Sequence, residues 1–139
     1  MNQNKFKSEL EAHKVRVTKI RVAILEHLHN QNNALSHTEI EKDLSELCDR
    51  VTIWRNLQTL EENNILHSFK DSEGTARFAL CDHSLCKKEH QDNHLHFECR
   101  ICKTHSCIND IEANIPALPQ GYQLEELQLH ATGICPKCK

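Results

Sequence analysis

The chain has 139 residues with 17 Lys+Arg against 20 Asp+Glu, a formal net charge of −3, so its overall charge does not indicate a nucleic-acid partner. Any DNA binding would depend on a local basic surface, because affinity for phosphates is set by the cations at the contact. The length suits one average domain or two small ones, and two small ones would need a metal or dimerisation for stability.

The cysteine count and the opening segment bear on the cellular compartment. Eight cysteines are present, which would fit a secreted disulfide scaffold. However, the opening segment MNQNKFKSEL has no apolar run after its lysines, and no stretch approaches membrane-spanning length. We therefore expect a cytoplasmic protein with no membrane partner, whose reduced thiols bind metal.

The first part of the chain, residues 1 to about 65, is expected to be helical. From Thr18, apolar residues recur at three- and four-residue spacing, which predicts an amphipathic helix packed on a core. A second helix of about ten residues should begin at residues 36–39, because SHTE has the S-x-x-E form of a capping box. A third should be capped by Asp49 and end at the asparagine pair 63–64, since asparagine tolerates the left-handed conformation of helix ends.

Two strand-like runs follow at 65–69 and 76–80, and the segment between them contains the glycine that a hairpin turn needs. Three helices and a hairpin in this order predict a winged helix-turn-helix domain at residues 1–80, whose third helix enters the DNA major groove. Thr52 would then lie on the exposed face of that helix, and Arg16 or a neighbouring lysine would reach phosphate or the minor groove. The competing interpretation is that these are ordinary exposed polar residues.

Residues 81–93 are polar and aperiodic, which predicts a hinge before a second domain at residues 94–139. In the second domain we expect a strand at 94–99, a short helix near Ile111 and a strand at 122–130. The predicted fold class is α+β, with an N-terminal winged helix-turn-helix domain followed by a small α/β domain.

Two C-x-x-C pairs lie in the second domain, Cys99/Cys102 and Cys135/Cys138. Four thiolates that converge on one point satisfy a tetrahedral Zn²⁺ completely, so no water can be activated there and the expected role is structural. A disulfide pair or unrelated buried cysteines are the alternatives, and the paired spacing together with reduced thiols favours zinc.

Histidines that the four-cysteine site does not need predict a second metal site. Strand alternation places His94 and His96 on one face, so both imidazoles can reach one ion. Further candidate ligands are His67 and Cys81 at the two ends of the hairpin and Cys107 beyond the first cysteine pair. The alternatives are a solvated His67, a small buried Cys81 and an uninvolved Cys107. Three residues of the hinge are either ligands of an additional ion or simply solvated: His83, Cys86 and His90.

Four segments, taken in order, resemble the signatures of the ferric uptake regulator (Fur) superfamily of bacterial metal-dependent repressors. They are RVTKIR at 16–21, RVTIWRNL at 50–57, HLHFECRIC at 94–102 and GICPKC at 133–138. The resemblance covers nearly the whole chain. It implies that the second domain is a dimerisation domain, and that a homodimer binds an inverted-repeat operator in double-stranded DNA when metal is present.

The resemblance also implies roles for individual residues. Family members commonly have Tyr-Arg where this chain has Trp54 and Arg55, which implies a base contact for Arg55. The indole of Trp54 would pack on thymine methyl groups or donate its N–H to phosphate. The zinc uptake regulator (Zur) branch is most similar to this chain, because it has a cysteine at the position of Cys81 and a ligand at that of His67.

Three departures separate the chain from iron-type members, which have histidine, glutamate and aspartate where this sequence has Ala34, Ala79 and Leu95. Thiolate and imidazole ligands favour tetrahedral Zn²⁺ over octahedral Fe²⁺. We therefore expect a zinc-sensing repressor of metal uptake genes with a structural Zn²⁺ and a regulatory Zn²⁺, Fe²⁺ and Mn²⁺ being the other candidates for the second ion. An iron- or peroxide-responsive regulator is the alternative, and an interaction module without DNA binding is a third.

An enzyme is a remote alternative. The H-x-E at residues 96–98 and a distant C-x-x-C resemble the H-x-E…P-C-x-x-C signature of zinc-dependent nucleobase deaminases. In this chain the proline lies inside the pair, as CPKC at 135–138, and the first cysteine pair would compete for the same ion. We therefore expect no catalytic activity and no small-molecule substrate.

Overall fold

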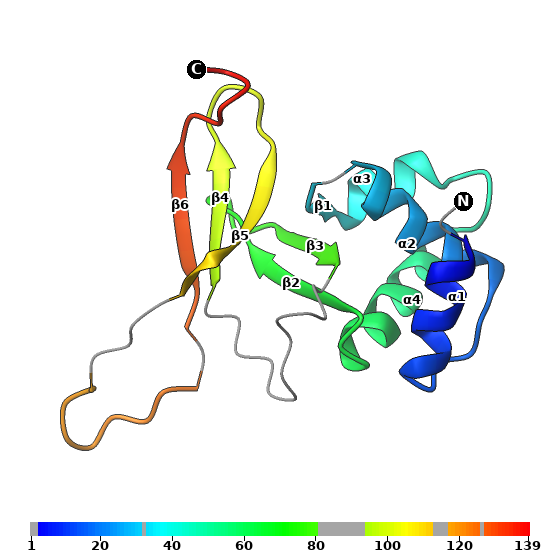
Figure 1. The fold of residues 1–139 in the computed structure, drawn as a ribbon, viewed down its shortest axis with the longest axis horizontal. Helices are drawn as coiled ribbons and strands as arrows, with labels where there is room; N and C mark the ends of the chain where they lie inside the picture. Colours follow the sequence, from blue (N-terminus) through cyan, green and yellow to red (C-terminus); the bar gives the residue numbers. More distant parts are fainter. Residues whose placement is uncertain (1–2, 32, 81–93, 113–116, 126) are drawn as a thin grey trace.

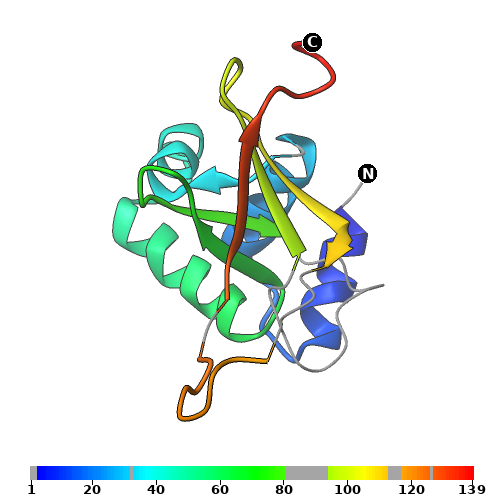
Figure 2. The same cartoon turned by 90° about the vertical axis from the view of Figure 1, so that its left-hand side faces the viewer.

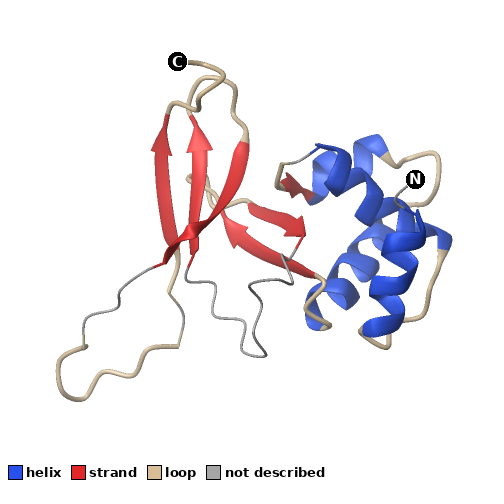
Figure 3. Cartoon of the chain, viewed as in Figure 1, coloured by secondary structure: helices blue, strands red, loops and turns tan. Residues whose placement is uncertain are grey.

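The chain folds as a group of N-terminal helices, a β-hairpin that extends from them, and a second sheet beyond the hairpin (Figure 1). Helices gather at one end and the hairpin and second sheet at the other (Figure 3). The computed structural model describes residues 3–31, 33–80, 94–112, 117–125 and 127–139, except for the side chains of residues 94 and 109–112.

The helices are α1 (Gln3–Ala12), α2 (Lys19–Gln31), α3 (His37–Asp43) and α4 (Arg50–Glu62). The strands are β1 (Leu35–Ser36), β2 (Leu66–Lys70), β3 (Ala76–Leu80), β4 (His94–Cys99), β5 (His105–Glu112) and β6 (Leu129–Gly133). Within the described ranges, none of the helices combines the length and apolarity that a bilayer crossing requires.

One apolar core holds the helices together. The apolar positions of α2 and α4 recur every three or four residues, so that one side of each helix is buried, as the sequence pattern predicted. Helix α1, which the pattern did not separate from the rest, packs Phe6 and Leu10 onto the same core. The fully buried residues of α2 and α4 are Ile24, Leu25, Ile53, Leu57 and Leu60.

Side-chain caps begin α3 and α4 at the predicted positions. The Ser36 hydroxyl accepts the N–H of Glu39 at 3.2 Å and the Glu39 carboxylate accepts the N–H of Ser36 at 3.0 Å, which completes the capping box. Asp49 accepts the N–H of Thr52 at 2.9 Å. Helix α3 has 7 residues rather than about ten, because the backbone leaves helical geometry at Leu44 (φ −110°).

The hairpin of β2 and β3 forms the wing. Its strands pair antiparallel, with Ser68 opposite Phe78, and Gly74 takes a positive φ of 81° in the turn between them. Strand β1 pairs with the other edge of β3, which gives the order β1-β3-β2. The segment that leads into α3 is therefore attached to the wing.

The second sheet has the order β5-β4-β6, with β4 antiparallel to β5 and parallel to β6. Two expectations are wrong here. Residue 111 lies in β5 instead of a helix, within an irregular stretch between the pair of Leu95 with Ile108 and the pair of His94 with Glu112, so that β5 continues along β4. The last strand begins at Leu129 instead of residue 122, because Pro119 accepts the Tyr122 N–H in a turn and only the later residues reach β4.

The second sheet crosses over the wing, as Figure 2 shows. The predicted hinge at 81–93 lies outside the described residues. The division into domains at 1–80 and 94–139 therefore stays a prediction.

Removal of the Ser36 hydroxyl tests whether its side-chain cap stabilises α3. We expect Ser36→Ala to lower the free energy of unfolding by about 1 kcal/mol, because it leaves the Glu39 N–H without its acceptor. Urea unfolding monitored by circular dichroism measures this difference. The exposed Ser45→Ala variant is the control, and equal stability of both variants would contradict the capping role.

Candidate metal centres

Four cysteines meet where β4 and β6 end. The parallel register places Cys99 opposite Gly133, so the pair that follows each strand lies beside the other pair. The sulfurs of Cys102 and Cys135 are 3.8 Å apart, and all four sulfurs lie within 4.8 Å of one another. The two predicted C-x-x-C pairs therefore form one cluster.

Hydrogen bonds shift the pKa values of two of these thiols in opposite directions. Backbone N–H groups of Cys102 and Cys135 donate to the Cys99 sulfur and lower its pKa to about 6. The Cys138 thiol donates to Cys135 and Cys102, which raises its pKa to about 12. Four thiolates at this separation repel one another unless a cation joins them, and a tetrahedral soft cation such as Zn²⁺ fits four sulfur donors.

A second cluster joins the wing to the second sheet. His67 of β2 places Nε2 3.3 Å from the Cys107 sulfur of β5, and His96 of β4 places Nδ1 3.6 Å from the same sulfur. These three donor atoms lie within 4.8 Å of one another. His67 is only 7% exposed, so it is not a solvated wing residue.

The structure thus brings together three of the five predicted regulatory ligands. Cys81 lies outside the described residues, as do His83, Cys86 and His90. The backbone of His94 belongs to β4, but its side chain is not described. Two nitrogens and one sulfur form a soft donor set that fits a transition metal.

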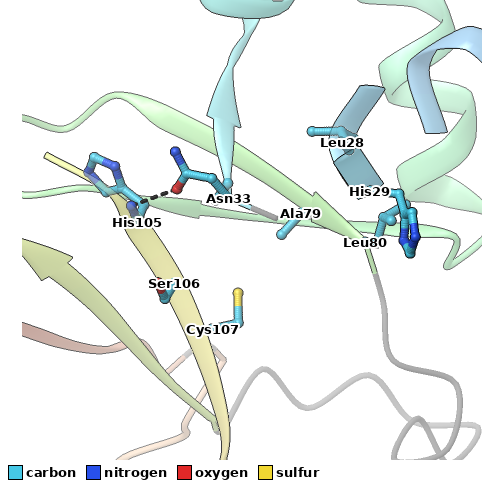
Figure 4. Close-up of a pocket in the computed structure, with 9 residues that line it drawn as sticks. Leu28, His29, Asn33, Ala79, Leu80, His105, Ser106 and Cys107 are labelled. Carbon is cyan, nitrogen blue, oxygen red and sulfur yellow. Dashed lines mark hydrogen bonds between the residues drawn. The ribbon is translucent and has the colours of Figure 1, made fainter. Parts of the chain in front are cut away.

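A cavity of about 280 Å³ lies beside Cys107, between the end of α2 and β5. Figure 4 shows Cys107 on β5 at one side of it and Leu28 and His29 at the other. Ala34 and Ala79 line the cavity and pack with Phe69 as a small apolar cluster against Cys107. Of the three donors of the second cluster that the structure describes, Cys107 is the one that lines this cavity.

A polar network that the sequence pattern did not predict lies in and beside the wing. Arg77 of β3 donates to both carboxylate oxygens of Glu39, at 2.8 and 2.9 Å, and to Asp71 at 3.0 Å. Burial opposes ionisation of Asp71, but hydrogen bonds from Arg77 and from the N–H groups of Thr75 and Glu73 lower its pKa overall. Helix α3 and the wing turn are thereby linked through one guanidinium.

The network continues into the second sheet. His105, which is 2% exposed, has Nε2 3.8 Å from Asp71 and 3.7 Å from Glu98. Burial and the charge of Arg77 lower the pKa of His105, against the two carboxylates. Ser72 of the wing turn donates to Glu98 at 2.8 Å. Strand alternation, which puts Glu98 on the same face as His96, is the sequence signal that could have indicated a carboxylate on this face.

Direct hydrogen bonds also attach the helical part to β5. The His105 N–H donates to the Asn33 side chain at 2.7 Å, and the Ala34 N–H donates to the His105 carbonyl at 3.0 Å. Because both bonds use the backbone of β5, its start is held against the segment before β1.

The four predicted DNA-contacting residues lie on the helical part. Arg55 and Arg16 are exposed and Thr52 is half-buried. Trp54 is 41% exposed, with its indole 5.3 Å from the His37 ring and near Phe78. Its ring therefore has support on one side and solvent on the other.

A protein-family model described as the ferric uptake regulator family matches residues 12–132. No curated protein sequence matches the chain significantly. Among solved structures, a zinc uptake regulator complexed with zinc and DNA is similar over 98% of this chain and 91% of its own, with 20% identity and a TM-score of 0.68.

Two further structures have the same fold. Holo XcZur covers 98% of this chain and 97% of its own, with 19% identity and a TM-score of 0.68. The Vibrio cholerae ferric uptake regulator covers 92% and 98%, with 23% identity and a TM-score of 0.59.

Neutralising Asp71 tests the polar network. Because its pKa is lower in the folded chain than in the unfolded chain, its stabilising effect is present above about pH 4 and lost as the pH falls through the folded-state pKa. We expect Asp71→Asn to lower the free energy of unfolding by about 2 kcal/mol at pH 7. The difference from the wild type should shrink as the pH falls, whereas exposed Glu62→Gln should show none. A pH-independent difference for Asp71→Asn in urea unfolding would contradict this assignment.

Proposed function

The chain belongs to the ferric uptake regulator family, and from this premise we propose that it is a zinc-responsive repressor that binds operator DNA as a homodimer. The observation that carries the proposal is the meeting of His67 from the wing with His96 and Cys107 from the second sheet. Regulators of this family respond to metals, and a structural relative is a zinc uptake regulator complexed with zinc and DNA.

The four-cysteine cluster is proposed as a structural Zn²⁺ site. All four donors lie at or just beyond the ends of two strands of the same sheet, so an ion there would tie β4 to β6 without touching the wing. A cation with four sulfur ligands has no open coordination position, which leaves it no role in catalysis.

The cluster of His67, His96 and Cys107 is proposed as the regulatory site, with Cys81 and His94 as further ligands. A bound Zn²⁺ would supply one positive centre shared by both sheets. The three described donors can share an ion only while the wing remains against the second sheet, so metal binding and this arrangement favour each other. By linkage, DNA that selects the same arrangement should tighten metal binding.

The DNA-binding surface is proposed to be α4 with the segment before α2. Arg55 would contact base edges, with Thr52 and Trp54 beside it and Arg16 on phosphate or in the minor groove. In a homodimer, two copies of α4 would enter major grooves roughly 34 Å apart or at a multiple of that distance.

The surroundings of the second cluster favour zinc over iron. Ala34 and Ala79 present methyl groups beside Cys107, at positions where iron-type members have metal ligands. A thiolate-bound zinc is also redox-inactive, which argues against peroxide sensing. Glu98, the proton-transfer residue of a deaminase-like site, instead accepts from Ser72 and lies near His105, so no enzymatic role is proposed.

Metal analysis and DNA binding test the proposal together. Operator duplexes are selected from a random pool with zinc-loaded protein, and binding is then titrated with Zn²⁺, Fe²⁺ and Mn²⁺. We expect two zinc ions per chain and DNA binding that requires the second. His96→Ala should retain one zinc and lose metal-dependent binding, because it removes a donor from the second cluster alone. Binding gated by Fe²⁺ with a single tightly held zinc would support the iron-responsive alternative.

Arg55→Ala tests the proposed reading helix. Loss of a bidentate base contact should weaken binding to the selected operator about 10- to 100-fold and relax preference at one position. Arg100→Ala removes the same exposed side chain from the loop after β4 and serves as the matched control. Equal affinities of the two variants in a fluorescence anisotropy titration would refute this role for Arg55.

A further inference from the structure

An aromatic residue of the wing lies directly on a proposed ligand of the second sheet. Phe69 follows His67 by two residues on β2, so both side chains are on the same face of the strand. The Phe69 ring is stacked on the His96 ring, with centroids 3.8 Å apart and an interplanar angle of 20°. The His67 ring lies 5.8 Å from His96 and 6.5 Å from Phe69.

This stack restricts the one rotation on which ligation by His96 depends. The terminal torsion of histidine is broad and not held in a sharp staggered well, so an unsupported imidazole samples many ring orientations. A flat ring at 3.8 Å blocks rotation out of the common plane. The ring edge that carries Nδ1 then stays directed at Cys107, 3.6 Å away.

The support of Phe69 is itself rigid. Its side chain is 3% exposed and packs with Ala34 and Ala79 in the small apolar cluster against Cys107. Displacement of the ring would require movement of Ala34, whose N–H is bonded to the His105 carbonyl, or of Ala79, which is paired with His67 in the first sheet. Phe69 therefore presents a fixed surface to the second sheet.

We propose that Phe69 is a positioning residue for metal binding, which orients the His96 imidazole only while the wing is in contact with the second sheet. The inference rests on the proposed regulatory site, and it names a side chain that binds no metal itself. The two stacked rings come from different sheets, so His96 is held in its ligand orientation only when the two sheets are in contact.

The test compares Phe69→Leu with wild type and with Phe6→Leu. Leucine keeps a buried apolar side chain at position 69 but has no ring. Phe6 is 1% exposed in the helical core, so Phe6→Leu makes the same substitution with similar burial elsewhere. All three proteins are prepared with zinc only at the four-cysteine site.

The first measurement needs no second metal ion. In the wild type and in Phe6→Leu, the ring current of Phe69 should displace the His96 ring-proton NMR signals upfield, and Phe69→Leu should lose this displacement. The second measurement is competition for zinc with a chromophoric chelator. We expect Phe69→Leu to bind the second zinc about 10-fold more weakly or worse, as for lost outer-shell support of a ligand, and Phe6→Leu to match the wild type.

The outcomes separate the two proposals. If Phe69→Leu loses the upfield displacement but binds the second zinc like the wild type, the positioning role is refuted and the regulatory site stands. Equal weakening in Phe69→Leu and Phe6→Leu would also refute it, since general stability would explain the effect. If the wild type binds no second zinc, the regulatory site and the role of Phe69 both fail.

Discussion

The contact of the wing with the second sheet is the constraint on which the rest of the molecule depends. Specific polar bonds hold it: Ser72 of the wing turn donates its hydroxyl to Glu98, and beside the wing Ala34, in the segment before β1, pairs with His105 through the main chain. Polar groups that lose water when two surfaces meet must find partners, so these bonds hold only in one relative position of the two sheets. That position places His67 within reach of the strand that carries Cys107.

Negative charge has different sources of balance on the two sides of this contact. Around the wing turn, the guanidinium of Arg77 balances Glu39 and Asp71 from within the chain. At the ends of β4 and β6, four cysteines bring only potential negative charge together. The Arg77 network contains its own cation, so its charges balance within the polypeptide. A cluster of thiolates has no such cation and needs one from solution, which supports its assignment as a metal site.

The proposed structural and regulatory roles of the two clusters rest on where their donors lie in the fold, more than on the chemistry of those donors. The four cysteines lie at the ends of two strands of one sheet, so an ion there would join β4 to β6 and would have no ligand from the wing. Donors drawn from both sheets make occupancy depend on their contact. A coupling of 1–3 kcal/mol, about 5- to 150-fold in affinity, is typical for such linked equilibria, and the stacked pair of Phe69 and His96 lies directly across this boundary.

The sequence by itself determined the elements whose signals are local. The caps at Ser36 and Asp49, the wing turn and the two C-x-x-C pairs each involve residues a few positions apart, and the structure has them as predicted. The predicted helix near residue 111 is wrong because β5 continues past that residue as far as the pair of Glu112 with His94, a long-range contact that outweighs local preference. The sequence left open whether Cys107 is a ligand or an uninvolved residue, and only the tertiary structure decided that its sulfur lies beside His67, 40 positions earlier in the chain. The physical reason is that this proximity depends on the strand registers of two sheets, which no short-range pattern encodes.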